Sequence, residues 1–461
     1  MAGSNFLKAP SSFRDPSGFI FEEKGVIFRQ VNESYRKNYD QLINSGLFKL
    51  LAGSGLIVDH QEIKNKELSK PAYKILQPDR IPFISYPYEW CFSQLKDAAL
   101  LTLEIQMISL KHGMSLKDAS AYNIQFVGGR PIFIDTLSFE SYPENKPWVA
   151  YRQFCQHFLA PLALISLVDF RLGTLSQIYL DGIPLDLASC LLPVKTRFSL
   201  GLAVHIHLHS RSQKKHEQIV EKRQDHNYQL SKNRLFAILE SLKSTINSLS
   251  LPKQKSEWGN YYDDTNYTLP AFAHKKEIIA KWMAEVRPES VWDAGANDGS
   301  FSRLSSKRNI FTLATDLDAL AIEKAYLRVK EEKDEFLLPL ILDFTDPSPA
   351  LGWANKERDS FLDRVRFDLV FCLAFIHHLA IANNLPFSNL ADLFRQHGRH
   401  LIIEFVPKED SNVQRLLSCR EDIFPDYNQE SFEKEFSRYF AIQARVPVKE
   451  SRRTLYLMKK R

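Results

Sequence analysis

The stretch Val291–Phe301 reads VWDAGANDGSF, and it decides the fold expected for the second half of the chain. Its apolar start is typical of a buried strand, its glycine-containing middle of a tight turn, and its end of the first turn of a helix. Gly295 and Gly299 let the backbone approach a ligand closely, and the following helix offers free amide donors at its N-terminus. The segment therefore predicts a ligand-binding strand–turn–helix unit.

Four further apolar runs follow, and they alternate with stretches of helical apolar spacing. They read IFTLATD, FLLPLILDF, FDLVFCLA and HLIIEFV. Strands buried on both faces are continuous apolar runs, and strands joined by helices run parallel. The pattern predicts an α/β fold with a Rossmann-like, doubly wound sheet, whose ligand lies beyond the carboxyl ends of the strands and near the first one.

The polar residues of the turn favour one kind of ligand over another. Asp293 precedes the first glycine, and Asn297 stands where the nicotinamide-binding fingerprint GxGxxG has its middle glycine. A pyrophosphate would be repelled by Asp293, whereas the ammonium group of a methionine moiety would be attracted to it. The turn therefore indicates a ligand with an amino-acid part rather than a dinucleotide.

The order of these pieces resembles that of class I S-adenosylmethionine-dependent methyltransferases, whose first motif has the form DxGxxxG here. The resemblance implies a seven-stranded methyltransferase sheet over residues 256–461 and S-adenosyl-L-methionine as cofactor. It also implies that Asp316 holds the ribose hydroxyls, that Asp343 and the backbone of Phe344 read the adenine, and that the aromatic segment EWGNYYDDTNY caps the cofactor. The cofactor-binding residues that it implies are Tyr262, Asp293, Gly295, Asn297, Gly299, Asp316, Asp343, Phe344, Leu373 and Ala374.

Later segments suggest a nearer group. DFTDPSPALGW, FIHHLAI, LIIEFVPKEDSNVQRLL and EDIFPDYNQESFEKEF are similar to a bacterial methyltransferase group that includes host-specific nodulation-type proteins. This similarity indicates the group without indicating a substrate.

Three residues are candidates for the chemistry of methyl transfer. The reaction is an in-line displacement at a sulfonium, so the protein must align the acceptor and, for some acceptors, remove a proton. His377 and His378 follow the fourth strand and are the first candidates for a general base, and Glu404, at the end of the fifth strand, is the next. The alternatives are that a histidine packs against or caps the next helix, or that the three residues bind a metal, which no cysteine or HxxxH spacing supports.

The first half of the chain has one informative stretch, HGMSLKDASAYNIQFVGGRPIFIDTLSFE at residues 112–140. Asp118 and Asn123 have DxxxxN spacing, and Asp135 follows an expected hairpin. This arrangement resembles the catalytic loop and metal-binding aspartate of protein-kinase-like and aminoglycoside-phosphotransferase-like folds. The resemblance implies that Asp118 orients a hydroxyl and that Asn123 and Asp135 bind Mg²⁺.

The same stretch departs from those families. Leu116 and Lys117 stand where a His-Arg or His-Gly pair would precede the aspartate, Thr136 replaces the usual Phe-Gly start, and no glycine-rich loop or Val-Ala-x-Lys strand is evident upstream. The alternative is that Asp118 and Asn123 are loop caps and that Asp135 forms a turn. Phosphoryl transfer therefore remains an open alternative for an N-terminal α+β domain.

Three domains or segments are expected from changes in composition. Residues 1–210 form the N-terminal domain, 211–255 a polar helical linker, and 256–461 the methyltransferase domain. Near the first boundary, AVHIHLHS contains three histidines at alternate positions. As a strand it would place them on one face, where they could bind a metal, whereas in a helix they would diverge. They are His205, His207 and His209.

Composition limits the setting and the partners. The 461 residues carry a net charge of only +5 with no basic arm, so nucleic acid is not implied as a partner. Five scattered cysteines without CxxC spacing favour a reducing, cytoplasmic location over a disulfide framework or a zinc site. The N-terminal residues lack the pattern of a secretory signal, and the most apolar stretch, Phe158–Val168, is too short to cross a bilayer, so no membrane association is expected.

The leading hypothesis is an enzyme that methylates a small molecule, a glycan or a natural-product intermediate, with the N-terminal domain recognising the acceptor. One alternative is a bifunctional methyl and phosphoryl transferase, which binding of ATP with magnesium would reveal. Another is a non-catalytic, ligand-binding adaptor, against which the intact acidic motif positions argue. The sequence indicates neither the accepting atom nor the oligomeric state.

Overall fold

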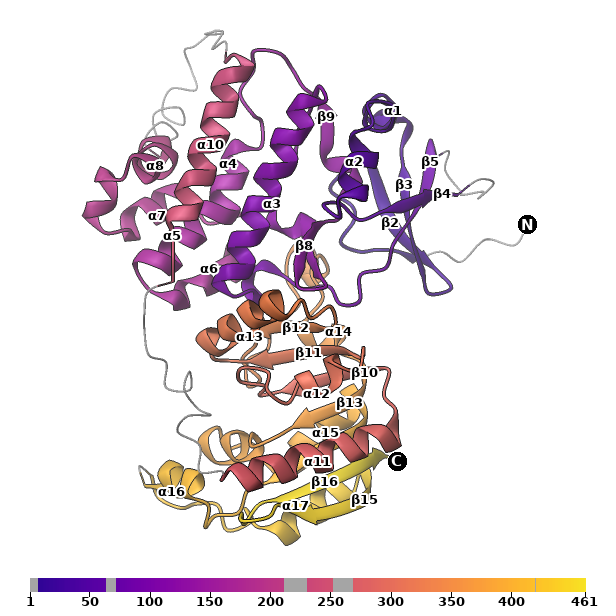
Figure 1. The fold of residues 1–461 in the computed structure, drawn as a ribbon, viewed down its shortest axis with the longest axis vertical. Helices are drawn as coiled ribbons and strands as arrows, with labels where there is room; N and C mark the ends of the chain where they lie inside the picture. Colours follow the sequence, from indigo (N-terminus) through magenta and orange to yellow (C-terminus); the bar gives the residue numbers. More distant parts are fainter. Residues whose placement is uncertain (1–6, 64–71, 211–229, 252–267, 419) are drawn as a thin grey trace. The chain divides into compact units, whose positions relative to one another are not determined.

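The computed structural model describes residues 7–63, 72–210, 230–251, 268–418 and 420–461 (Figure 1). Contacts between Cα atoms divide the chain into two compact units. Unit 1 consists of Met1–Lys253 and Ala350–Arg358, and unit 2 of Gln254–Pro349 and Asp359–Arg461. The predicted division did not include the second piece of unit 1, which comes from the middle of the methyltransferase region.

Unit 1 begins with a five-stranded antiparallel sheet in the order β1-β2-β3-β5-β4. Two helices stand between its third and fourth strands and bury Tyr39, Leu42 and Leu51. The elements are β1 (Leu7–Lys8), β2 (Gly18–Glu23), β3 (Val26–Val31), α1 (Arg36–Asn44), α2 (Leu47–Gly53), β4 (His60–Glu62) and β5 (Lys74–Pro78). An α+β N-terminal unit was predicted, and the sheet and helices confirm this fold class.

The rest of unit 1 is mostly helical. The long helix α3 (Phe92–Lys111) is buried on nearly all sides, which its high content of Leu, Ile and Ala allows. Two short antiparallel pairs follow it: β6 (Met114–Leu116) with β9 (Phe139–Ser141), and β7 (Ile124–Val127) with β8 (Arg130–Phe133). The later helices are α4 (Tyr151–Phe154), α5 (Ala160–Leu167), α6 (Leu175–Ile178), α7 (Leu185–Leu191), α8 (Leu200–Leu202) and α10 (Lys232–Ser248), with π-helical turns η5 (Cys155–Leu159) and η8 (Ala203–Leu208).

The segment Ala350–Arg358 belongs to unit 1 although it lies between two elements of unit 2 in the sequence. Glu357 forms an ion pair with Arg14, with 2.6 Å between Oε1 and Nε. The guanidinium of Arg358 lies 4.1 Å from the centroid of the Tyr122 ring, which is a cation–π contact. Two charged side chains at the end of the segment thus join it to unit 1.

Unit 2 contains a seven-stranded sheet in the order β12-β11-β10-β13-β14-β16-β15. The first five strands of this order are parallel, and β16 is antiparallel to both of its neighbours. The strands are β10 (Ser290–Ala294), β11 (Phe311–Asp316), β12 (Leu337–Ile341), β13 (Phe367–Cys372), β14 (Gly398–Phe405), β15 (Phe440–Pro447) and β16 (Thr454–Lys460). This sheet confirms the predicted fold, and its strand order reverses between β10 and β13.

Helices cover both faces of this sheet, as its continuously apolar strands require. They are α11 (Leu269–Val286), α12 (Arg303–Ser306), α13 (Ala319–Glu332), α14 (Phe361–Arg364), α15 (Phe387–His397), α16 (Ser411–Leu417) and α17 (Gln429–Ser437). None of the helices in the described ranges combines the length and the hydrophobicity needed to cross a bilayer.

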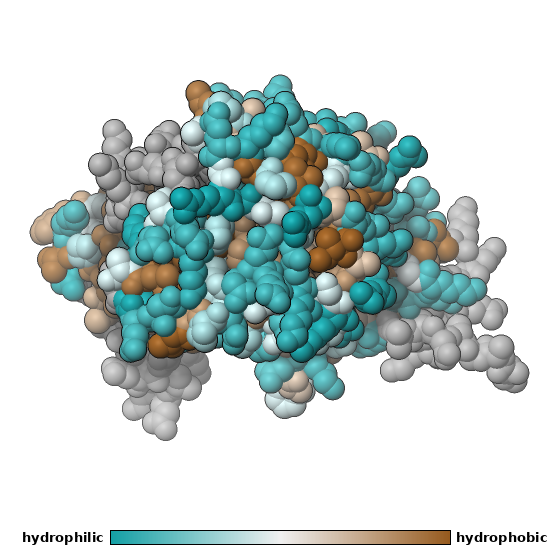
Figure 2. Space-filling model, turned by 90° about the horizontal axis from the view of Figure 1, so that it is seen from below, coloured by the Kyte–Doolittle hydropathy of each residue, from teal (hydrophilic) through white to brown (hydrophobic). Residues whose placement is uncertain are grey.

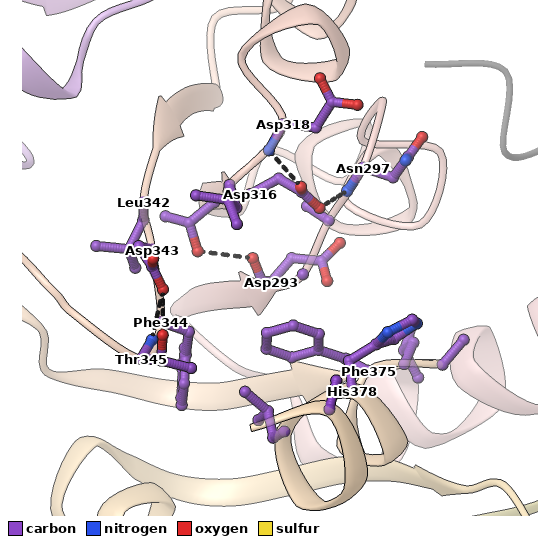
Figure 3. Close-up of a pocket in the computed structure, with 18 of the residues that line it drawn as sticks. Asp293, Asn297, Asp316, Asp318, Leu342, Asp343, Phe344, Thr345, Phe375 and His378 are labelled. Atoms are coloured by element: carbon purple, nitrogen blue, oxygen red, sulfur yellow. Dashed lines mark hydrogen bonds between the residues drawn. The ribbon is translucent and has the colours of Figure 1, made fainter. Parts of the chain in front are cut away.

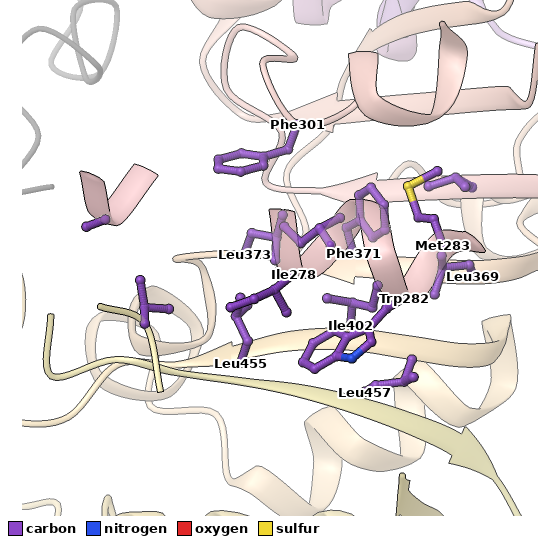
Figure 4. Close-up of a cluster of buried hydrophobic side chains, with 14 residues drawn as sticks. Ile278, Trp282, Met283, Phe301, Leu369, Phe371, Leu373, Ile402, Leu455 and Leu457 are labelled. Carbon is purple, nitrogen blue, oxygen red and sulfur yellow. The ribbon is translucent and has the colours of Figure 1, made fainter. Parts of the chain in front are cut away.

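The main core of unit 2 lies between α11 and the sheet (Figure 4). Ile278, Trp282 and Met283 recur at helical spacing on one face of α11 and pack on strand residues that include Phe371 and Ile402. Each such side chain contributes roughly 1.5–3 kcal/mol when it is fully buried. The helix is therefore packed firmly against β10, β13, β14 and β16.

The face shown in Figure 2 is mostly hydrophilic, and its apolar side chains form small separate groups. Scattered apolar side chains are usual on protein surfaces. This face therefore does not indicate a site.

Candidate functional site

The turn after β10 requires glycine at its first position. Gly295 has a φ of +77°, and a Cβ added to it would lie 2.6 Å from Cγ of Phe375. Only glycine both adopts this left-handed backbone conformation without strain and leaves room for the Phe375 ring. Asn297 also has a positive φ, of 51°, which asparagine tolerates better than most residues.

A cavity of about 250 Å³ opens at the carboxyl ends of the parallel strands in unit 2 (Figure 3). The place agrees with the rule that ligands of such sheets bind where the strand order reverses. Of the residues predicted to bind the cofactor, those that line it are Asp293, Gly295, Asn297, Asp316, Asp343, Phe344, Leu373 and Ala374. Gly299 is not a lining residue, and Tyr262 lies outside the described residues.

Asp316 ends β11 and faces the turn. Its Oδ2 accepts a hydrogen bond of 2.8 Å from the Asn297 amide, and its Oδ1 accepts one of 2.9 Å from the Asp318 amide (Figure 3). Burial raises the pKa of Asp316 to about 6, although the two amides oppose the shift. Each carboxylate oxygen has two lone pairs, so Asp316 can accept further hydrogen bonds from ligand hydroxyls.

Asp293 lies at the end of β10 and is almost fully buried. Its Oδ2 accepts a hydrogen bond of 2.6 Å from the Ser302 hydroxyl. Burial raises the pKa of Asp293 to about 7, while Ser302 and the nearby Lys275 lower it. The side chain is thus a carboxylate in a poorly solvated place, where a cationic ligand group would favour its ionised form.

The rings of Phe344 and Phe375 form part of the cavity wall. Phe344 stacks on Trp292 with 5.6 Å between ring centroids. The ring of Phe375 packs edge-on against the ring of Phe344, with 5.5 Å between centroids. Asp343 accepts hydrogen bonds from the amide and the hydroxyl of Thr345, at 2.8 and 2.6 Å. An apolar wall beside a carboxylate can hold a flat, polar-edged ring.

A buried ion pair that was not predicted from the sequence includes one residue of the cavity wall. Lys275 of α11 is 1% exposed, and its Nζ lies 2.6 Å from Oε2 of the fully buried Glu404. Lys275 lines the cavity, whereas Glu404 does not. Burial lowers the pKa of Lys275, and Glu404 opposes this shift only in part. A sequence signal existed, because Lys275 continues the apolar face of α11 that carries Ile278 and Trp282.

The two predicted histidines have different environments. His378 lines the cavity at the start of the π-helical turn η10 (His378–Ala382), whereas His377 has no exposed surface and is not a lining residue. Their rings are 4.2 Å apart. Burial lowers the pKa of His378 to about 4 and that of His377 well below its ordinary value, so both imidazoles are neutral at pH 7.

His377 also carries unsatisfied polar atoms. Within the described part of the chain, neither of its ring nitrogens has a hydrogen-bond partner. Buried polar atoms normally have partners, so this imidazole is held at a cost in free energy. Only His378 of the pair is placed to meet a ligand in the cavity.

The kinase-like candidates in unit 1 lie near one another. Asn123 donates a hydrogen bond of 3.2 Å to the Ser138 hydroxyl, which donates to Asp135, and Asn123 also bonds to Asp118. Asp135 forms an ion pair with Arg29 of β3. Burial raises the pKa of Asp135, but Arg29 and Ser138 outweigh it and leave the pKa below its ordinary value.

Metal binding gains no support from this geometry. Arg29 supplies the charge that a cation would supply at Asp135. No group of three or more His, Cys, Asp or Glu side chains in the described ranges is placed to hold a metal ion.

The three histidines near the predicted linker do not lie on a strand. They belong to η8 and to the helical residue after it. His205 contacts the hydroxyls of Tyr151 and Ser241 at 2.6 and 2.9 Å, and His207 contacts hydroxyls at 2.7 and 2.8 Å. The strand-based hypothesis of a metal site is wrong because the segment is helical and these two imidazoles are bonded to hydroxyl groups.

Fold and site together define a class. Unit 2 has the class I S-adenosylmethionine-dependent methyltransferase fold, because its five parallel strands reverse their order beside β10 and are followed in the sheet by the antiparallel strand β16 and by β15, and because an acid stands at or just after the end of each of β10, β11 and β12. No family model matches the chain. Over 456 residues it is 35% identical to nodulation protein NoeA of Rhizobium meliloti (strain 1021), a match that covers 97% of this chain and 95% of that protein. The chain belongs to the family of nodulation protein NoeA.

Solved structures of methyltransferases are similar to less than half of the chain. Magnesium protoporphyrin IX methyltransferase (ChlM) from Synechocystis PCC 6803 is 15% identical, and the match covers 44% of this chain and 93% of that one with a TM-score of 0.31. The bifunctional kinase-methyltransferase WbdD is 14% identical, with 43% and 41% covered and a TM-score of 0.30. The methyltransferase domain of a bacterial Hen1 protein is 14% identical, with 41% and 99% covered and a TM-score of 0.29.

Proposed function

We propose that the protein is an S-adenosylmethionine-dependent methyltransferase whose acceptor is a small molecule, a glycan or a natural-product intermediate. The observation that carries this proposal is the single cavity in which Asp293, Asp316 and Asp343 meet, each from the end of a different strand. The experiment is calorimetry with S-adenosylhomocysteine, followed by transfer of a radiolabelled methyl group to fractions of cell extract. Absence of binding would overturn the proposal. Binding without methyl transfer to any fraction would favour the alternative of a non-catalytic, ligand-binding adaptor.

The cavity offers a suitable group for each part of this cofactor. Asp316 would accept hydrogen bonds from the ribose hydroxyls, and Asp343 with the Phe344 backbone would hold the adenine. Asp293 would attract the ammonium group, and Leu373 and Ala374 would lie beside the methionine chain. When bound, the cofactor supplies a methyl group made electrophilic by the sulfonium. The residues of the protein then have to orient the acceptor and exclude water.

His378 is the group that we assign to proton removal from the acceptor. It lines the cavity and is neutral at pH 7, so it has a lone pair for a proton. Its low pKa makes it a weak base in the free protein. Its role therefore depends on an acceptor whose proton becomes acidic as the bond to carbon forms.

Replacing His378 with alanine should slow methyl transfer by roughly 100-fold and leave cofactor affinity unchanged. His377→Ala is the matched control, because the His377 ring packs against the His378 ring but does not line the cavity. Single-turnover kinetics with the acceptor identified by the extract screen measures both. If His378→Ala reacts at the normal rate, the imidazole is structural and the acceptor needs no base from this side chain.

Cofactor affinity should rise with pH between about pH 5 and pH 8. Burial raises the pKa of Asp316 to about 6 and that of Asp293 to about 7, so both are partly protonated in the lower part of this range. Ligand hydroxyl and ammonium donors bind the ionised forms, and binding therefore releases protons and is favoured as pH rises. Calorimetry in buffers of different ionisation enthalpy measures the released protons. A flat affinity across the range would contradict this prediction.

We assign unit 1 to recognition of the acceptor rather than to phosphoryl transfer. Its five-stranded sheet, its helix after the third strand and its DxxxxN loop agree with the kinase-like resemblance. The ion pair between Arg29 and Asp135 disfavours Mg²⁺ at Asp135, so the proposal contains no magnesium-dependent step. Stabilisation of the protein by ATP only when magnesium is present would restore the bifunctional alternative.

A further inference from the structure

Exposed apolar side chains gather on one side of unit 1, within residues 191–208, and we call this region the apolar surface. It spans the end of α7, the 3₁₀-helical turn η7 (Val194–Phe198), α8 and η8. Figure 1 shows α7 and α8 at the edge of unit 1 opposite its five-stranded sheet. Exposed apolar residues usually occur singly, and a group of them marks an interaction site. The members are Leu191, Val194, Phe198, Leu200, Val204 and Leu208, with exposed fractions of 88% at Phe198 and 80% at Leu200.

Three of these side chains lie along one face of a helix. Leu200, Val204 and Leu208 recur at every fourth residue of the continuous helix formed by α8 and η8, so they project in similar directions. The other face of this helix buries Leu202 and Ile206. The apolar stripe of a helix normally faces the core. This helix therefore has a second apolar stripe, which faces solvent.

Hydrogen bonds beneath the apolar surface fix its parts relative to one another. The imidazole of His207 in η8 lies 2.7 Å from the Ser189 hydroxyl of α7 and 2.8 Å from the Thr196 hydroxyl of η7. Gly201 of α8 packs so closely on α10 that a Cβ at this position would clash with Thr245. One histidine thus joins three of the elements that carry the exposed side chains, and the apolar surface is preformed by the fold.

Positive charge accompanies the apolar side chains. In η7 the exposed residues Lys195 and Arg197 stand between Val194 and Phe198, and the nearest acid along the chain, Asp186, precedes the apolar surface. Lysine and arginine side chains are long enough to reach lipid phosphates while their apolar neighbours enter the acyl-chain region. Basic residues beside exposed Phe and Leu are the combination that suits an anionic bilayer.

We propose that the apolar surface binds a bilayer that contains anionic lipids. Phe198 and Leu200 enter the boundary between headgroups and acyl chains, and Lys195 and Arg197 contact the lipid phosphates. Binding of this kind requires no spanning helix. The proposal departs from the prediction, made from the sequence, that the protein does not associate with membranes. It goes beyond the proposed function and does not depend on it.

Two other occupants of the apolar surface fit less well. A second copy of the chain would bring its own Lys195 and Arg197 to a symmetric interface, where like charges oppose association. The segment that follows, residues 211–229, has Ile219 and Val220 as its aliphatic residues among eight charged ones. This composition is too polar to cover a group of six large apolar side chains.

Sedimentation of the full-length protein with lipid vesicles tests the proposal. The wild type should bind vesicles of phosphatidylglycerol and phosphatidylcholine more tightly than vesicles of phosphatidylcholine alone, and salt should weaken this preference. Phe198→Ser with Leu200→Ser should lower the affinity for both kinds of vesicle by about 10-fold or more, because apolar contact is lost. Lys195→Gln with Arg197→Gln should lower only the affinity for the anionic vesicles, by about 10- to 30-fold.

Leu269→Ser serves as the control, because Leu269 of α11 is 87% exposed and lies outside the apolar surface. It should bind vesicles as the wild type does, and thermal unfolding of each variant should be unchanged because the replaced side chains are exposed. A wild type that binds neither kind of vesicle overturns the proposal, as does wild-type binding by the Phe198 and Leu200 variant or an equal loss in the control. A dimer in light scattering that this double variant dissociates also overturns it and makes a second copy the occupant.

Discussion

Replacing Glu404 with leucine is expected to lower the free energy of unfolding by about 3–5 kcal/mol at neutral pH, because it leaves the ammonium of Lys275 buried without its carboxylate partner. The loss should shrink as pH rises. The unpaired lysine has a lower pKa in the folded protein than in the unfolded chain, so the unfolded state binds more protons and stability increases with pH. Urea denaturation at several pH values, with the slope checked for constancy, measures this effect.

A second substitution separates the lost charge from the changed shape. Lys275→Met together with Glu404→Leu removes both charges and should restore most of the stability at every pH. If the single variant is as stable as the wild type, the ammonium reaches solvent or another partner and the pair is not the closed contact that the 2.6 Å distance indicates.

Replacing Asp316 with alanine should weaken binding of S-adenosylhomocysteine by about 2–4 kcal/mol. The substitution removes the charge-assisted hydrogen bonds to the two ribose hydroxyls and also leaves the Asn297 and Asp318 amides without their acceptor. The turn after β10 thus loses its bond to β11, and part of the expected loss comes from a less ordered Gly295 backbone. Calorimetry measures the affinity, and thermal unfolding without ligand shows whether the fold persists.

Two further variants serve as controls for this measurement. Asp316→Asn keeps the shape of the side chain and loses the charge, so its affinity should fall between those of wild type and alanine. Asp346→Ala removes an exposed acid outside the cavity and should bind normally. Unchanged affinity of Asp316→Ala would remove the central assignment of the cofactor site.

The fold of unit 2 was predictable because its signals are local. Each buried parallel strand is a continuous apolar run, and each of the first three along the chain carries an acid at or just after its end. The order of the strands and the acids at the sheet edge can therefore be predicted from the sequence. Asp293, Asp316 and Asp343 meet because parallel strands end at one edge of the sheet. No knowledge of side-chain packing is needed for that step.

The parts that the sequence did not predict depend on packing over long separations. Lys275 and Glu404 are far apart in the chain and meet only because α11 packs across β14. His377 and His378 are neighbours, yet the π-helical turn that begins at His378 decides which ring lines the cavity. The sequence spacing predicts Asp135 as a metal ligand, whereas its ion pair with Arg29 is formed only in the folded structure.

Ala350–Arg358 has a consequence for how the protein is made. The N-terminus of a protein emerges from the ribosome first, and domains ordinarily fold in the order in which they emerge. Here Arg14 and Tyr122 are synthesised early, but their partners Glu357 and Arg358 are synthesised only after Gln254–Pro349 of the second unit. The first unit therefore completes its packing during the synthesis of the second, and a shortened gene that stops at Lys253 would yield a first unit that lacks one of its own pieces.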